Sequence, residues 1–91
     1  MQDPTSTDSL MEFPCSFDIK AMGKADEGFA LLVLDIVKRH APEATEQSVR
    51  TRPSKGGKWL AVTVTIEATG KPQLDAIYQA LTDHEKVVMA L

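Results

Sequence analysis

The stretch that decides the fold is SKGGK followed by WLAVTVTIEAT, residues 54–69. The adjacent glycines Gly56 and Gly57 can adopt positive φ angles without a steric penalty, so they favour a tight hairpin turn. After the turn, apolar side chains at every second position from Leu60 to Ala68 alternate with more polar ones. This period of two predicts a strand over residues 58–69 with one buried face.

Helical patterns flank this hairpin on both sides, and a strand-like run lies beyond each helix. The predicted elements are, in chain order, a strand over 16–22, a helix over 27–40, strands over 47–52 and 58–69, a helix that begins near Pro72, and a strand over 86–91. This order predicts an α+β, ferredoxin-like βαββαβ two-layer sandwich. Right-handed crossovers place both helices on one face of a four-stranded antiparallel sheet, with strand order 4-1-3-2.

The first predicted helix is strongly apolar. Asp26 precedes it and is a candidate N-cap, because aspartate side chains accept hydrogen bonds from free amides at helix starts. Leu31 and Leu34 widen the apolar stripe, which predicts a heavily buried helix.

The last predicted strand is apolar on both faces. We expect Val87 and Met89 to face the helices, with Val88 and Ala90 on the open face. An exposed apolar edge strand can pair with a strand of another chain. A homodimer through the last strand or the open sheet face is therefore expected.

The chain is 91 residues long, with 43% hydrophobic and 25% charged residues, which is typical of a single globular domain. Residues 1–11 are polar and aperiodic and are predicted to form a disordered tail before a domain over 12–91. No apolar run is long enough to span a membrane, and no secretory signal is visible. Because Cys15 is the one cysteine, we expect a reduced, cytoplasmic protein.

The sequence carries no catalytic or metal-binding signature. His40 and His84 lack ligand spacing, a lone cysteine cannot supply a metal pair, and no serine has a histidine partner. We therefore predict a non-enzymatic protein with no catalytic residues, no metal and no cofactor.

RNA recognition by a fold of this kind requires aromatic side chains on the open face of the central strands. Here that face is expected to carry Asp18, Lys20, Thr63 and Thr65. The stacking platform is absent, so no specific nucleic acid is predicted as a partner.

A basic cluster surrounds the hairpin. Arg50, Arg52, Lys55 and Lys58 lie within ten residues that contain no acid, and Trp59 follows them. One interpretation is edge protection, since positive charges discourage strand addition at a sheet edge. The other is a surface for an anion or an acidic partner.

The chain resembles the YbeD-like family of small conserved bacterial proteins over residues 10–91. The residues that carry the resemblance are Phe13-Pro14, Phe17, Lys20, Met22-Gly23, Arg39-His40-Ala41-Pro42, Pro53-Ser54-Lys55-Gly56, Ala68-Thr69, Tyr78, Leu81 and Val88-Met89. Trp59 departs from the pattern, because a smaller aromatic such as tyrosine is expected there.

Members of that family look like ACT regulatory domains, which bind amino acids beside metabolic enzymes. The resemblance implies a ligand site at the first strand–helix loop, near a subunit interface; in this chain that loop is Met22, Gly23, Lys24, Ala25 and Asp26. Free amides at the following helix start are suited to a carboxylate. The alternative interpretation is a plain turn.

Two functions are therefore expected from the sequence. The first is an ACT-like regulatory or binding module that recognises a small metabolite or a metabolic enzyme. The alternative is a protein-interaction adaptor that uses the basic hairpin without any small-molecule ligand.

Overall fold

The computed structural model describes residues 12–91 of the chain. Its elements are β1 (Cys15–Lys24), α1 (Phe29–Lys38), a short 3-10 helix η2 (Glu46–Ser48), β2 (Val49–Pro53), β3 (Trp59–Ala68), α2 (Lys71–Asp83) and β4 (Met89–Ala90). The tail expected over residues 1–11 lies outside this range, and the assignment of 12–91 to a single domain stays a prediction.

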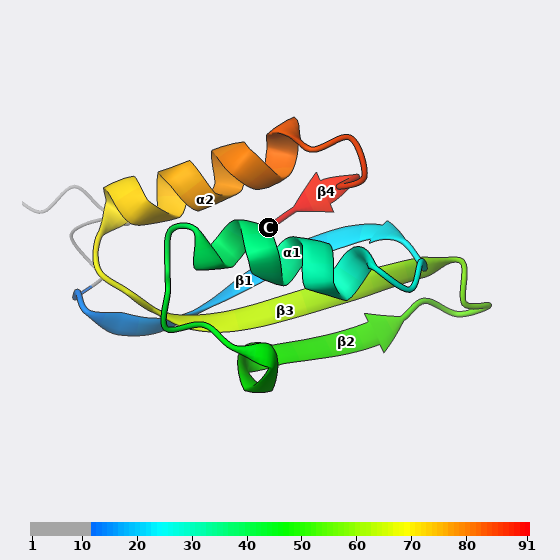
Figure 1. Cartoon of the computed structure of the whole chain (residues 1–91), viewed down its shortest axis with the longest axis horizontal. Coiled ribbons are helices and arrows are strands. Elements are labelled where there is room, and N and C mark those ends of the chain that lie inside the picture. The colour runs from blue at the N-terminus through cyan, green and yellow to red at the C-terminus, as the bar shows by residue number, and fades with distance from the viewer. Residues whose placement is uncertain (1–11) are drawn as a thin grey trace, which may run out of the picture.

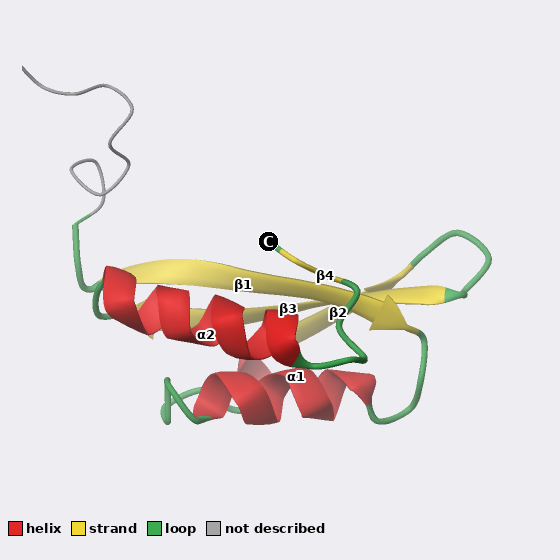
Figure 2. Cartoon of the chain, turned by 90° about the horizontal axis from the view of Figure 1, so that it is seen from above, coloured by secondary structure: helices red, strands yellow, loops and turns green. Residues whose placement is uncertain are grey.

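The four strands form one antiparallel sheet in the order β2-β3-β1-β4, and both helices lie on the same side of it (Figures 1 and 2). The predicted α+β ferredoxin-like sandwich and its strand order are confirmed. One face of the sheet is covered by α1 and α2, and no helix or strand of residues 12–91 covers the other face, which we call the open face (Figure 2).

The long strands β1 and β3 form the centre of the sheet. They pair over ten positions, from Cys15 opposite Ala68 to Lys24 opposite Trp59. Their alternate apolar residues point toward the helices and are buried together with the inner stripes of α1 and α2. The buried core is Ile19, Ala21, Phe29, Val33, Leu34, Ile36, Val37, Ala41, Ala44, Val62, Val64, Ile66, Ala68, Leu74, Ile77, Leu81 and Val87.

The hairpin turn has the predicted glycine geometry. Gly56 and Gly57 have φ angles of 90° and 77°, a region that side chains with a Cβ rarely adopt. The Ser54 amide donates to the Trp59 carbonyl at 2.8 Å, and the Trp59 amide donates to the Ser54 hydroxyl at 3.0 Å.

The start of α1 differs from the prediction. The N-cap is Gly28, with no side-chain capping bond, so the assignment of Asp26 as N-cap is wrong. Asp26 instead accepts the Phe29 amide with its backbone carbonyl at 3.0 Å, and its carboxylate turns to Lys86. Leu31 was expected to be buried but is 58% exposed, because it lies off the stripe of α1 that faces the sheet.

Strand β2 begins two residues later than predicted. Residues Glu46–Ser48 form η2, which is closed by a capping box. The Thr45 hydroxyl accepts from the Gln47 amide at 3.2 Å, and the Ser48 hydroxyl accepts from the Thr45 amide at 3.1 Å. These local bonds compete with strand pairing at this point.

Strand β4 is short, and its alternation is the reverse of the prediction. Met89 pairs with Met22 and Ala90 with Ala21. Because Ala21 is buried against the helices, Ala90 shares that side, while Met89 lies on the open face and is 49% exposed. The placement of Met89 toward the helices and of Ala90 on the open face is therefore wrong. A bend at Val88 interrupts the extended chain after buried Val87.

Candidate functional site

Three connections gather at one end of the molecule: the β1–α1 loop, the β2–β3 hairpin and the α2–β4 loop (Figure 1). β4 pairs with β1 at Ala21 and Met22, so within residues 12–91 the C-terminal end of β1 has no strand neighbour on that side. A hollow of about 420 Å³ lies at this end, within the range of about 300–1,000 Å³ typical of small-molecule sites. Its lining residues are Lys24, Asp26, Phe29, Trp59, Glu85, Lys86 and Val88.

Only Lys24 and Asp26 of the five ligand residues predicted from the sequence line this hollow. Met22, Gly23 and Lys24 belong to β1 and not to the loop, because the strand continues two residues beyond its predicted end. The Ala25 amide donates to the Lys58 carbonyl at 2.9 Å, so it is already used within the fold.

Gly23 has a packing role in the structure. A Cβ at this position would lie 2.5 Å from the Lys86 carbonyl oxygen and 2.6 Å from the Phe29 ring. The close approach that glycine allows here is therefore made by the chain's own α2–β4 loop and by the first residue of α1.

The hollow combines an apolar wall with charges of both signs. Phe29, Trp59 and Val88 supply the apolar part of its lining. At the rim, the Lys86 ammonium lies 3.6 Å from the Asp26 carboxylate, with both side chains 56% exposed. An ion pair as exposed as this one is weak and readily exchanges partners.

Four lining residues were not among the site residues predicted from the sequence: Phe29, Glu85, Lys86 and Val88. Phe29 follows the apolar period of α1 and is indistinguishable there from any other core residue. The other three lie around a tight turn near the C-terminus, and no local pattern connects that turn to the β1–α1 loop. Trp59 was assigned to the basic hairpin, but it also lines this hollow.

The cations of the basic hairpin differ in the contacts that they make. Arg50 donates to the Asp18 carboxylate and to the Thr65 hydroxyl, at 3.2 Å each, and the Thr65 hydroxyl donates to Asp18 at 2.7 Å. These bonds and the Arg50 charge hold the pKa of Asp18 below its usual value of 3.8, with the Thr65 hydrogen bond as the main cause. Arg50 is thus engaged on its own sheet.

The other hairpin cations are less constrained. Within residues 12–91, Arg52, Lys55 and Lys58 form no ion pair. The Lys58 ammonium lies 5.6 Å from the centre of the Trp59 ring, which is within the range of a cation–π contact. Edge protection and a partner surface both remain compatible with this arrangement.

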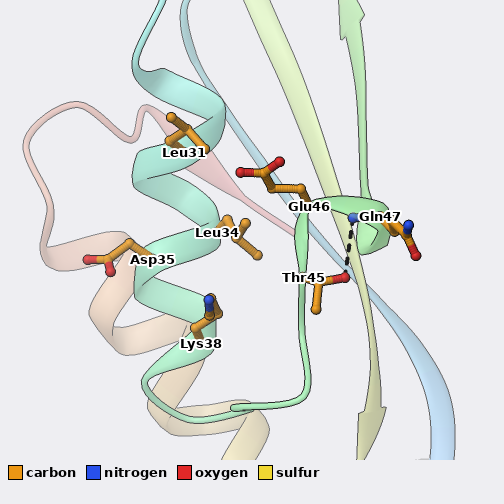
Figure 3. Close-up of a pocket in the computed structure, with 7 residues that line it drawn as sticks. All are labelled: Leu31, Leu34, Asp35, Lys38, Thr45, Glu46 and Gln47. Carbon is orange, nitrogen blue, oxygen red and sulfur yellow. Dashed lines mark hydrogen bonds between the residues drawn. The ribbon is translucent and has the colours of Figure 1, made fainter.

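A second and larger hollow of about 730 Å³ lies between α1 and the segment that leads into β2 (Figure 3). Leu31 and Leu34 extend from α1 toward Glu46 on the other wall. The polar groups do not converge on one point, since Thr45 is bonded to the Gln47 amide and Asp35 is paired with Arg39 at 2.9 Å. This groove offers no set of groups that would orient a small ligand.

Of the two histidines, His84 uses its ring in a local hydrogen bond, and His40 contributes a backbone carbonyl to a contact with α2. The Nδ1 atom of His84 accepts from the Lys86 amide at 3.1 Å, and the His40 carbonyl accepts from the Gln73 side chain at 2.8 Å. Within the described part of the chain, no group of three or more His, Cys, Asp or Glu side chains is arranged to hold a metal ion. Neither helix there is long and apolar enough to cross a membrane.

Comparison with known proteins shows a match over residues 8–91 to the family described as "Protein of unknown function (DUF493)". The chain belongs to this family. The resemblance to small conserved bacterial YbeD-like proteins is thereby confirmed.

Relatives in several bacteria extend over almost the whole chain. A UPF0250 protein of Nitrosomonas europaea is 49% identical over 92% of this chain and 97% of its own length. A UPF0250 protein of Paraburkholderia phytofirmans is 46% identical over 92% and 94%, and one of Janthinobacterium sp. is 42% identical over the full length of both chains. These names state no reaction.

Proposed function

We propose that the protein is a non-enzymatic regulatory or binding module that recognises a small metabolite or a partner metabolic enzyme, and the structure favours the metabolite. The observation that carries this proposal is the hollow lined by Lys24, Asp26, Phe29, Trp59, Glu85, Lys86 and Val88. It lies beside the β1–α1 loop, where the ACT-like resemblance places a ligand. We refer to it as the three-loop hollow.

The lining of the three-loop hollow supports a ligand that carries both charges and an apolar part. Lys24 and Lys86 supply positive charge for a carboxylate, and Asp26 and Glu85 supply negative charge for an ammonium group. Phe29, Trp59 and Val88 offer an apolar surface for a side chain. A small zwitterion with an apolar side chain, which is the chemistry of a free amino acid, satisfies all three parts.

Binding is expected to use the exposed Lys86–Asp26 pair. A carboxylate that replaces Asp26 as the partner of Lys86 leaves Asp26 available to an incoming ammonium group. Because the pair is exposed, this exchange avoids the large penalty of separating a buried ion pair. Among the described residues, no nucleophile with an adjacent base lines the hollow, so the arrangement favours binding over catalysis.

Tryptophan fluorescence tests the proposal, because Trp59 is the one tryptophan of the chain and lines the hollow. We expect a saturable change in emission when the full chain is titrated with an apolar amino acid such as leucine or methionine. A panel should include dicarboxylic acids and amines, which carry only one of the two required charges. Equal responses to all three classes would contradict the zwitterion assignment.

A matched pair of variants localises the signal. Lys86→Ala removes a rim cation, and we expect it to weaken leucine binding by about fivefold, the upper end for a single exposed charged contact. Lys38→Ala removes a cation from the groove between α1 and β2 and should leave the affinity unchanged. A chain that gives no saturable response to any amino acid would overturn the proposal.

Self-association is the second part of this proposal. Val88, Met89 and Leu91 are 62%, 49% and 67% exposed along the β4 edge, so pairing of this edge with a second copy would bury apolar surface. We expect light scattering of the full chain to report a dimer and Met89→Glu to shift it toward the monomer. A monomeric mass at high protein concentration would contradict it.

The alternative function is a protein-interaction adaptor that uses the basic hairpin. The absence of ion pairs at Arg52, Lys55 and Lys58 among the described residues favours it, whereas Arg50 is engaged with Asp18. A variant with charge reversal at Arg52 and Lys55 separates the metabolite module from the adaptor, because it removes the hairpin charge and should retain leucine binding. Loss of a protein partner in that variant alone would support the adaptor.

A further inference from the structure

The open face of the sheet has an ordered arrangement of side chains near the hairpin. Residues Lys20, Met22 and Lys24 alternate with the covered positions of β1 and therefore share this face. Opposite them on β3 lie Thr63, Ala61 and Trp59, in that order. On β2, Arg52 lies opposite Ala61, so Met22, Ala61 and Arg52 form one row across three strands.

An apolar depression marks the middle of this arrangement. A hollow of about 190 Å³ is lined by Met22, Arg52, Pro53, Ser54, Trp59 and Ala61. Met22 and Trp59 are half-buried, and methionine side chains adapt readily to different apolar partners. The depression is large enough for one aliphatic side chain, and its volume is below the range of about 300–1,000 Å³ that is typical of small-molecule sites.

Positive charge surrounds the depression. Lys20 and Lys24 lie two residues to either side of Met22, which places their Cα atoms about 7 Å from it along the strand. Within residues 12–91, neither lysine nor Arg52 forms an ion pair. Asp18 is the nearest acid on β1 on this face, and its carboxylate already accepts from Arg50 and Thr65.

We propose that this open face binds an acidic, extended peptide segment of a partner protein. The segment has an apolar side chain at one position and carboxylates two residues to either side of it. An extended chain has the same spacing of about 7 Å between alternate residues, so the three side chains match Lys20, Met22 and Lys24. The apolar side chain occupies the depression beside Trp59, and Arg52 is placed for a further carboxylate.

The chemistry of the face favours a peptide over a nucleic acid. Single-stranded nucleic acids are held by successive stacking of bases on several aromatic side chains. Trp59 is the one aromatic residue on this face among the described residues, and the centre is formed by Met22 and Ala61. This inference concerns a different surface from the three-loop hollow and does not depend on it, although Trp59 borders both hollows and Lys24 takes part in both proposals.

Amide NMR of the labelled full chain tests the proposal with three synthetic peptides. The first has the pattern Glu-Ser-Leu-Ser-Glu, the second has Ser in place of Leu, and the third has Lys in place of both Glu residues. We expect saturable shifts from the first peptide at residues 20–24, at Arg52 and at the Trp59 indole. The second should bind more weakly, and the third should not bind.

Charge-reversal variants give the matched comparison. Lys20→Glu and Arg52→Glu should each weaken the first peptide by roughly tenfold, since reversal removes one attraction and adds one repulsion. Lys38→Glu, on α1 behind the sheet, should leave binding unchanged. Neither Lys20 nor Arg52 lines the three-loop hollow, so leucine binding should be retained in both variants.

Three results would overturn the inference. They are no saturable shift with the first peptide, shifts that map to α1 and α2, and equal affinity in the Lys20→Glu and Lys38→Glu variants. A single-stranded oligonucleotide that displaces the first peptide and binds more tightly would assign the face to nucleic acid instead.

Discussion

Different interactions stabilise the two faces of the sheet. On the covered face, Ile19, Val62 and Val64 are fully buried against the helices. On the open face, the neighbouring strands are joined by the exposed contacts of Arg50, Asp18 and Thr65. The covered face is stabilised by removal of apolar surface from water, which is the largest favourable contribution to folding. Exposed polar contacts of this kind contribute little to stability.

The largest expected effect on the free energy of unfolding is a difference between substitutions at two adjacent residues of β1. Ile19→Ala should lower the free energy of unfolding by about 2–5 kcal/mol, because it leaves a cavity in the core. Lys20→Ala, one residue further on the open face, should change it by less than about 0.5 kcal/mol. Urea denaturation followed by circular dichroism measures both, and similar losses would break the distinction between the faces.

The next largest effect on stability is expected at Gly23, where the covered face meets the three-loop hollow. Gly23→Ala should cost about 1–3 kcal/mol, because its Cβ would overlap the Lys86 carbonyl and the Phe29 ring. Gly28→Ala is the control, since nothing lies within 4 Å of a Cβ built there, and replacement of the N-cap glycine of α1 should cost less than the overlap at Gly23. If thermal denaturation shows equal stability for the two variants, Gly23 is not required by packing.

A smaller effect is expected at the C-terminus. The Tyr78 hydroxyl donates to the Leu91 carbonyl and helps to hold the last residues against β1. Tyr78→Phe should cost about 0.5–1.5 kcal/mol at neutral pH, as for a typical hydrogen bond. Urea denaturation measures this loss, and none at neutral pH would show that the bond does not anchor the chain end.

The same tyrosine predicts a pH dependence. Burial raises the pKa of Tyr78 above its ordinary value of 10.0, so the unfolded chain loses this proton at lower pH than the folded chain does. The stability of the native sequence should therefore fall as the pH rises above 10, and Tyr78→Phe should remove this contribution. Parallel slopes for the two proteins in that range would contradict the assignment.

The smallest expected effect lies on the open face. The pKa of Asp18 is lowered by the Thr65 hydrogen bond and by Arg50, so its carboxylate stabilises the fold at pH values above the unfolded value of about 3.8. Asp18→Asn should be slightly less stable than the native sequence at neutral pH. The difference should disappear as the pH falls through the depressed pKa, and a difference that persists in acid would show a cause other than charge.

The covered face could be predicted from the sequence, because its buried residues recur at the spacing typical of a strand or a helix. The alternation from Leu60 to Ala68 predicted β3, and the Gly56-Gly57 pair predicted the hairpin. The last strand was predicted less well. A bend at Val88 shifts the alternation by one residue, and such a bend has no signature in a run of apolar residues.

The candidate site could be predicted only in part from the sequence. Lys24 and Asp26 belong to the predicted loop, but Glu85, Lys86 and Val88 approach it from the other end of the chain. That approach depends on where β4 stops beside β1, which is a matter of three-dimensional packing. Arg50 is engaged by Asp18 two strands away, whereas Arg52 forms no ion pair within residues 12–91, and this difference likewise follows from three-dimensional packing.

The most direct test of the account is an amide NMR titration of the labelled full chain with leucine. We predict saturable shifts at residues 24–28, at Glu85 to Val88 and at the Trp59 indole, with the amides of α1 beyond its first turn and of β2 unchanged. An intact spectrum with no shifts, or with shifts confined to the groove between α1 and β2, would contradict the central claim that the three-loop hollow is a metabolite site.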